Sequence, residues 1–349
     1  MPDISKNNHI SIAKAFGIIL MVVGHSGGPT IINNFIYLFH MPLFLVCSGY
    51  FFKEITDSST LLQFYKKKIK GLYYPYFKWS IMFLLLHNIF RYLNITQSKI
   101  YQVEDYLNQF AKLVAMTDYE LLIRPFWFIK ELFFASIFVA TISFVCNRLF
   151  AKYNTEILLI IALILSFLTK YISPIPIIGD SSVLCLSIAY YYSGIILNKY
   201  KHHIHISFVT LLLTFAIVFI GSIFYEGIID MRFTKTSNLL LYYILSISGI
   251  IFIICLATKF DQLKGFSFLY YIGNHTMPIL ALNLLALKIG NLIKIWYYNL
   301  PIDSLASYTV INDNNTLFWL LYSIIGVSIP LLIDFTLIKY CRKKEKTII

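Results

Sequence analysis

The stretch Lys14-Ala-Phe-Gly-Ile-Ile-Leu-Met-Val-Val-Gly-His25 is an apolar run with a polar side chain at each end. With its flanking residues it is long enough to cross a bilayer as a helix. Eleven residues at ~100° each make about three turns, so Lys14 and His25 lie on one stripe, roughly 16 Å apart along the axis. A histidine inside a membrane helix is costly unless it has a function. We therefore expect Lys14 and His25 to hold two ends of one long ligand.

The composition places the chain in a membrane. Of its 349 residues, 58% are hydrophobic and 13% are charged, whereas a soluble domain is about one quarter charged. The first apolar run lacks a charged leader and a small-residue cleavage site, so we expect no cleavable signal peptide. The net charge of +12 does not indicate nucleic acid, because the cations lie in short connections between apolar runs. The five cysteines have no metal-ligand spacing, and we expect no metal site.

We predict an all-α, polytopic membrane protein with about ten transmembrane helices, forming a single integral-membrane domain over residues 1–349 without a separate soluble domain. If the N-terminus is cytoplasmic, most lysines fall in inner connections, as the positive-inside rule requires. Both termini are therefore expected in the cytoplasm. The predicted spans are 10–28, 32–52, 73–93, 126–149, 155–173, 181–198, 206–225, 238–257, 273–295 and 317–338.

Two further groups of polar residues lie in or beside predicted spans. His40 comes two residues before Pro42, so it either bonds a carbonyl freed by the proline or lines the same cavity as His25. Arg124 and Trp127 enter the fourth span from outside, where an interfacial anchor is the common interpretation.

Two adjacent charges, Lys130 and Glu131, lie inside the fourth span, and at least one of them should face a polar cavity. The basic stretch 63–70 is expected to be an inner connection that attracts anionic lipids or a phosphate-rich cofactor from the cytosol. Its cations are Lys66, Lys67, Lys68 and Lys70.

Several motifs together resemble one known family. A basic residue, ten residues and a histidine run from Lys14 to His25, and the second span carries Phe39-His40-Met41-Pro42-Leu43-Phe44 followed by Ser48-Gly49-Tyr50. Similar stretches are 72–76, 125–128 and 271–276. The chain thereby resembles the integral-membrane acyltransferase-3 family, bacterial enzymes that O-acylate cell-surface carbohydrate.

Three positions depart from that family's pattern. Ser11 stands where many members carry Asp, Asn283 where many carry His, and His275 where Asn is frequent. The first two departures remove polar partners that would orient the site.

The resemblance implies transfer of an acyl group, expected to be acetyl, from cytosolic acetyl-CoA to a hydroxyl of a surface glycan or lipid-linked oligosaccharide, in the bacterial cytoplasmic membrane. His25 would act as general base or acyl relay, with His40 in the same cavity. Lys14 and the lysines of 66–70 would hold the anionic end of acyl-CoA, and the acceptor would contact Arg124, Trp127 and Glu131. The alternatives are a transporter or flippase of a lipid-linked sugar, which gives no reason for the Lys14–His25 stripe, and a glycan polymerase.

Overall fold

The structure of the protein is a computed structural model that describes residues 8–150, 154–170, 181–203, 207–226, 229–232, 238–263, 265–311 and 317–347. Its described part is helical, without strands, which confirms the all-α prediction. The helices are α1 (Asn8–His25), α2 (Thr30–Tyr37), α3 (His40–Tyr50), α4 (Ser58–Lys68), α5 (Tyr74–Leu85), α6 (His87–Tyr92), α7 (Val103–Val114), α8 (Trp127–Leu149), α9 (Thr155–Thr169), α10 (Ser181–Lys199), α11 (Phe208–Phe224), α12 (Leu239–Gln262), α13 (Ser267–Asn274), α14 (Thr276–Tyr298) and α15 (Phe318–Thr347). Shorter turns are η1 (Ile69–Tyr73), η2 (Leu121–Phe126), η3 (Lys201–His203) and η5 (Ile302–Ala306).

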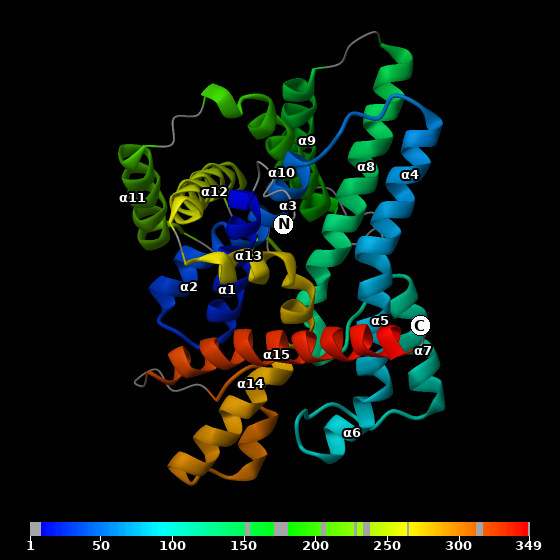
Figure 1. Ribbon diagram of the computed structural model, residues 1–349, viewed down its shortest axis with the longest axis vertical. Coiled ribbons are helices and arrows are strands. Elements are labelled where there is room, and N and C mark those ends of the chain that lie inside the picture. The colour runs from blue at the N-terminus through cyan, green and yellow to red at the C-terminus, as the bar shows by residue number, and fades with distance from the viewer. Residues whose placement is uncertain are drawn as a thin grey trace.

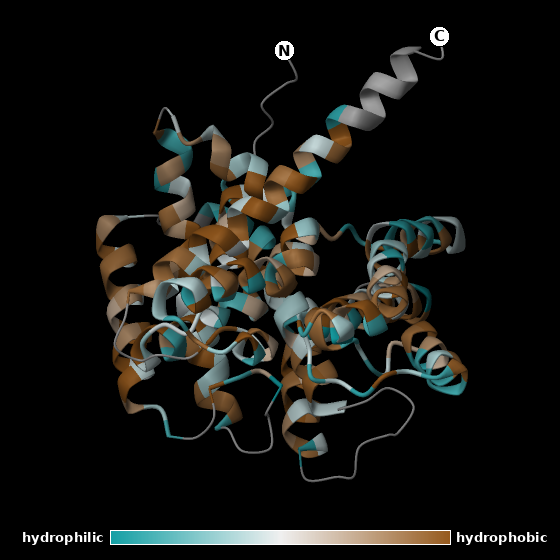
Figure 2. Cartoon of the chain, turned by 90° about the horizontal axis from the view of Figure 1, so that it is seen from below, coloured by the Kyte–Doolittle hydropathy of each residue, from teal (hydrophilic) through white to brown (hydrophobic). Residues whose placement is uncertain are grey.

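Seven helical stretches in the described part are long and apolar enough to cross a membrane, which agrees with a polytopic protein. They include α1, the joined pair α2–α3, and η2 with α8. Two of the other predicted spans are the shorter apolar helices α9 and α11. Both carry rows of exposed Ile, Leu and Phe side chains, as lipid-facing helices do. Figure 2 shows that hydrophobic residues dominate the long helices.

The third predicted span has a different form in the structure. The helical run begins at Ser58 and continues through α4, η1, α5 and α6 to Tyr92. The capping box of Asp57 and Thr60 explains why it starts so early, because Asp57 accepts hydrogen bonds from the free amides of the first turn. The stretch 63–70 is therefore helical and continuous with α5, while its place on the inner side of the membrane stays a prediction.

Helix α1 lies at the centre of the bundle and contacts α2, α3, α12, α13, α14 and α15 (Figure 1). Close helix crossings surround it. A Cβ atom on Gly273 would overlap the carbonyl oxygen of Ser11, and one on Gly49 would overlap that of Tyr191. Small residues allow such backbone approach where lipid supplies no hydrophobic drive to association. These crossings fix α1 against α13 and α3 against α10.

Candidate functional site

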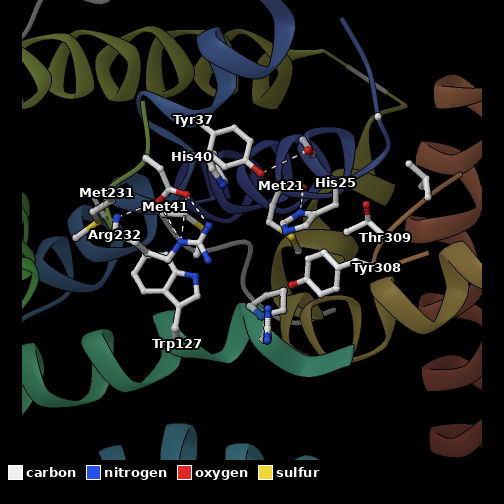
Figure 3. A pocket seen from close by; sticks show the side chains of 16 residues that line it. Met21, His25, Tyr37, His40, Met41, Trp127, Met231, Arg232, Tyr308 and Thr309 are labelled. Atoms are coloured by element: carbon white, nitrogen blue, oxygen red, sulfur yellow. Dashed lines mark hydrogen bonds and ion pairs between the residues drawn. The ribbon is translucent and has the colours of Figure 1, made fainter. Parts of the chain in front are cut away.

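A cavity of about 460 Å³ opens where α1 ends and α8 begins. Its walls come from five separate parts of the chain, which are the last turn of α1, the α2–α3 junction, η2 with the start of α8, the connection before α12, and the connection between α14 and α15. Figure 3 shows side chains converging on this space from those parts. By the predicted orientation, all of them lie at the outer face of the membrane.

His25 is the last residue of α1 and lines this cavity. Its Nδ1 lies 2.7 Å from the carbonyl oxygen of Met21. A carbonyl oxygen only accepts, so Nδ1 carries the proton and donates it to this bond. In the neutral ring Nε2 then has a free lone pair, which is the state that a general base or a nucleophile requires.

His40 lines the same cavity and repeats this arrangement. Its Nδ1 donates to the carbonyl oxygen of Ile36 over 2.9 Å, and its ring meets that of Tyr37 edge-on at a centroid distance of 5.0 Å. His40 therefore lines the cavity of His25, as one of the two interpretations expected, and it bonds the carbonyl of Ile36 and not the Leu38 carbonyl that Pro42 frees. Tyr37 also reaches α1, because its hydroxyl donates to the carbonyl oxygen of Gly24 at 3.4 Å.

A charged pair forms another part of the wall. Arg232 donates from Nη2 to Oδ2 of Asp230 at 2.6 Å and from Nε to both carboxylate oxygens. Its guanidinium lies over the ring of Trp127, 5.6 Å from the centroid. Burial lowers the pKa of Arg232, but the Asp230 carboxylate outweighs it and the net shift is upward. The cavity of His25 therefore contains a permanent cation held between a carboxylate and an indole.

Three residues of α14 hold the connection that supplies Tyr308 and Thr309. Lys288 donates to the carbonyl oxygen of Leu305 at 3.0 Å and to that of Ser307. Asn291 donates to the Thr309 carbonyl and accepts from the Ile311 amide, and Lys294 donates to the Ile311 carbonyl at 3.0 Å. The three side chains are at most 4% exposed and three residues apart, so they share one face of α14. This polar ladder fixes the 305–311 backbone against the bundle.

Of the acceptor residues expected from the sequence, Arg124 and Trp127 line the cavity. Arg124 also lies over the ring of Tyr308, 5.4 Å from its centroid. Glu131 is 6% exposed, one turn further along α8 than Trp127, and it does not line the cavity. Its place on the helix turns it into the bundle interior.

Lys14 also lies away from the cavity of His25. It is half-buried on α1. Between the two ends of the stripe, Ile18 is 2% and Met21 is 1% exposed. The structure therefore separates Lys14 from His25 by packed side chains.

The four lysines of 66–70 lie on α4 and η1, also away from this cavity. Lys66, Lys67 and Lys70 are exposed. Lys68 is half-buried, with its ammonium 5.2 Å from the ring centroid of Phe64 and 5.6 Å from that of Tyr191.

Two of the three residues that depart from the family pattern make hydrogen bonds away from the cavity of His25. Asn283 is fully buried and donates to the carbonyl oxygens of Ile279 and Leu280 in its own helix. Ser11 donates weakly to Asn274 at 3.4 Å. Neither residue lines the cavity.

The sequence interpretation missed Asp230, Arg232 and Tyr308 as site residues. Their only sequence signal is that they are polar residues in connections predicted to face outward. Nothing local links residue 230 or 308 to residue 25.

A family model described as an acyltransferase domain matches residues 7–335, nearly the whole chain. The chain therefore belongs to the acyltransferase-3 family and is a multi-pass membrane acyltransferase. No curated protein and no solved structure matches it.

Proposed function

We propose that the protein transfers an acetyl group from cytosolic acetyl-CoA to a hydroxyl of a cell-surface or lipid-linked glycan in the bacterial cytoplasmic membrane. The observation that carries this proposal is the His25 imidazole, whose Nδ1 is fixed by Met21 and which lines a cavity beside a permanent cation. An acyl transfer to a hydroxyl requires a base at that place.

In the direct form of the reaction, Nε2 of His25 takes the proton from the acceptor hydroxyl. The hydroxyl oxygen attacks the thioester carbonyl, the carbon–sulfur bond breaks, and the coenzyme A thiolate leaves and recovers the proton. In the relay form, Nε2 attacks the thioester carbonyl, the carbon–sulfur bond breaks and the coenzyme A thiolate leaves. The acceptor hydroxyl then attacks the acyl group on the ring, the nitrogen–carbon bond breaks, and the proton of the hydroxyl neutralises the thiolate. Arg232 and Arg124 are cations at the cavity that would stabilise the oxyanion in either form.

The test uses membranes containing the protein, acetyl-CoA and the surface glycan of the host, with mass spectrometry of the glycan. We expect a mass gain of one acetyl group per modified sugar. His25→Ala should lower the transfer rate by at least ~10²-fold, while His202→Ala, which changes an exposed histidine of η3, should not. Normal transfer by His25→Ala at equal expression would remove His25 from the mechanism, and glycan movement without acetyl-CoA consumption would indicate a flippase.

The donor end of the proposal depends on Lys14. A half-buried cation at this depth suits the phosphates of coenzyme A, so Lys14→Ala should raise the KM for acetyl-CoA roughly tenfold. Lys53→Ala, which changes an exposed lysine of an inner connection, is the matched control. Because Ile18 and Met21 are packed between Lys14 and His25, the donor reaches His25 only if this packing opens. An unchanged donor KM would exclude Lys14 as a donor contact.

A further inference from the structure

A second cavity of about 850 Å³ lies next to the cavity of His25. Arg124 and Tyr308 line both cavities, so the two spaces meet at this pair. The second cavity is formed by the 97–101 stretch, α7, the residues leading into η2, and η5 with the residues after it. By the predicted orientation it belongs to the outer face, like the first.

The lining of the second cavity is polar and carries more carboxylates than cations. Gln109 of α7 is 6% exposed and lines the cavity, and no hydrogen bond joins its amide to any other residue that the structure describes. Asp118 and Asp303 add carboxylate oxygens, and Ser304 and Ser307 add hydroxyls. The amide of Gln109 can therefore donate to and accept from a ligand in the cavity.

A network of hydrogen bonds and ring stacking fixes the part of the lining that contains His87, Tyr101 and Glu120. His87 Nδ1 lies 2.7 Å from Oε2 of Glu120, and its Nε2 lies 3.0 Å from the carbonyl oxygen of Lys99. The ring of Tyr101 stacks on His87 at a centroid distance of 3.4 Å. The side chain of Asn88 bonds both the amide and the carbonyl of Tyr101. Such a network preorganises a surface, which lowers the entropy cost of binding.

A further hydrogen bond joins the two outer connections beside the cavity, at Asp303 of its lining. Asn94 donates to Asp303 at 2.8 Å, although the residues are 209 positions apart in sequence. The polar ladder of α14 holds the same connection from its other side through Leu305 and Ser307. The walls are thus tied to each other and to the bundle.

We propose that the second cavity is a glycan subsite, which binds the sugars adjacent to the one whose hydroxyl is acylated at His25. This inference rests on the proposed function. Sugar hydroxyls both donate and accept, so they match the amide of Gln109 and the carboxylates of Asp118 and Asp303. Those carboxylates disfavour a phosphate-bearing ligand such as coenzyme A. The continuity at Arg124 and Tyr308 lets one oligosaccharide occupy both cavities.

The subsite makes acceptor length a determinant of activity. In the transfer assay, we use mono- to tetrasaccharides released from the host surface glycan. We expect kcat/KM to rise about tenfold from one sugar to three, because each well-made hydrogen bond adds on the order of a few-fold to tenfold. Gln109→Ala should remove most of this rise. Asn108→Ala is the matched control, because Asn108 is the exposed neighbour of Gln109 on the same helix.

A binding experiment separates this inference from the proposed function. The full-length His25→Ala protein in lipid nanodiscs is applied to an array of neutral mono- to hexasaccharides. Binding that favours three or more sugars and is weakened by adding Gln109→Ala supports the subsite, even if no acetyl transfer is ever detected. Absence of array binding, equal binding of all lengths, or a length preference that survives Gln109→Ala overturns it, even if acetyl transfer depends on His25 as proposed.

Discussion

His25 and His40 hold their rings in the same way. Each donates Nδ1 to the carbonyl oxygen four residues earlier in the chain, that of Met21 for His25 and that of Ile36 for His40. The bond fixes the tautomer without any carboxylate partner, because a carbonyl oxygen can only accept. Both Nε2 atoms remain available, and both residues line one cavity. A backbone carbonyl therefore does here what an acidic side chain does in many other sites.

A lysine at position 232 tests whether the transfer rate depends on the positive charge alone or also on the fixed position of the Arg232 guanidinium. Arg232→Lys keeps a positive charge but loses the paired bonds to Asp230 and the planar contact with Trp127. We expect the acetyl-transfer rate to fall by roughly 10- to 100-fold, because the cation no longer has a fixed position in the cavity. The measurement is the initial rate at saturating acetyl-CoA.

The control for this change is Arg148→Lys. Arg148 lies over the ring of Phe144 at 5.5 Å, a similar cation–aromatic contact near the other end of α8. If Arg232→Lys and Arg148→Lys have equal rates, the fixed guanidinium at the cavity has no catalytic role.

The second span illustrates how an element break creates part of the site. Pro42 lies in the first turn of α3, where its missing amide hydrogen has no cost, so the chain starts a new helix there. The carbonyls freed at the break are satisfied by α12, since Tyr242 donates to the Tyr37 carbonyl at 3.0 Å and Ser246 donates to that of Leu38. The break thereby turns Tyr37 and His40 toward His25.

A change in the polar ladder of α14 should lower both the stability and the transfer rate, although the ladder side chains do not line the cavity of His25. Asn291→Leu keeps the size of the side chain but removes its bonds to Thr309, Ile311 and the hydroxyl of Tyr322, which donates at 2.8 Å. We expect a stability loss of about 1–3 kcal/mol and faster proteolysis within the 299–311 connection, together with slower transfer. Limited proteolysis of purified protein measures the first effect.

Asn299→Gly is the comparison for this variant. Asn299 ends α14 in the left-handed region at φ 51°, which glycine adopts without strain, and the change leaves the ladder in place. Equal protease resistance in Asn291→Leu and the natural protein would show that the ladder does not hold the connection.

Five parts of the chain meet around the cavity of His25, at one face of the helix bundle. If both termini are cytoplasmic, as predicted, this face is outside. In a protein whose cysteines are replaced, Asn108→Cys should react with a membrane-impermeant maleimide in intact cells, and Lys53→Cys should react only after lysis. Both positions are exposed, so the difference reports the membrane and not burial. The reverse labelling pattern would place both cavities on the cytosolic side.

The membrane class, the helical fold and most span positions follow from the sequence, because hydropathy is a local property that each segment carries by itself. The sequence also singled out His25 and His40, because a buried imidazole is costly wherever it lies in a membrane helix. Both line one cavity in the structure. The helix that contains the third predicted span begins earlier, at Ser58, because the capping box at Asp57 extends it through the polar residues before the span.

Only the tertiary structure decided which residues meet. Asp230, Arg232 and Tyr308 reach the cavity of His25 from positions more than 200 residues away, and Asp303 of the second cavity is bonded to Asn94, 209 positions earlier. Glu131 was expected at the acceptor site, but its place on α8 keeps it out of the cavity of His25. Lys14 was expected at the other end of its stripe, and packed side chains of α1 lie between it and His25. Local periodicity gives the face on which a residue lies, whereas the partner of that face depends on contacts between distant helices and loops.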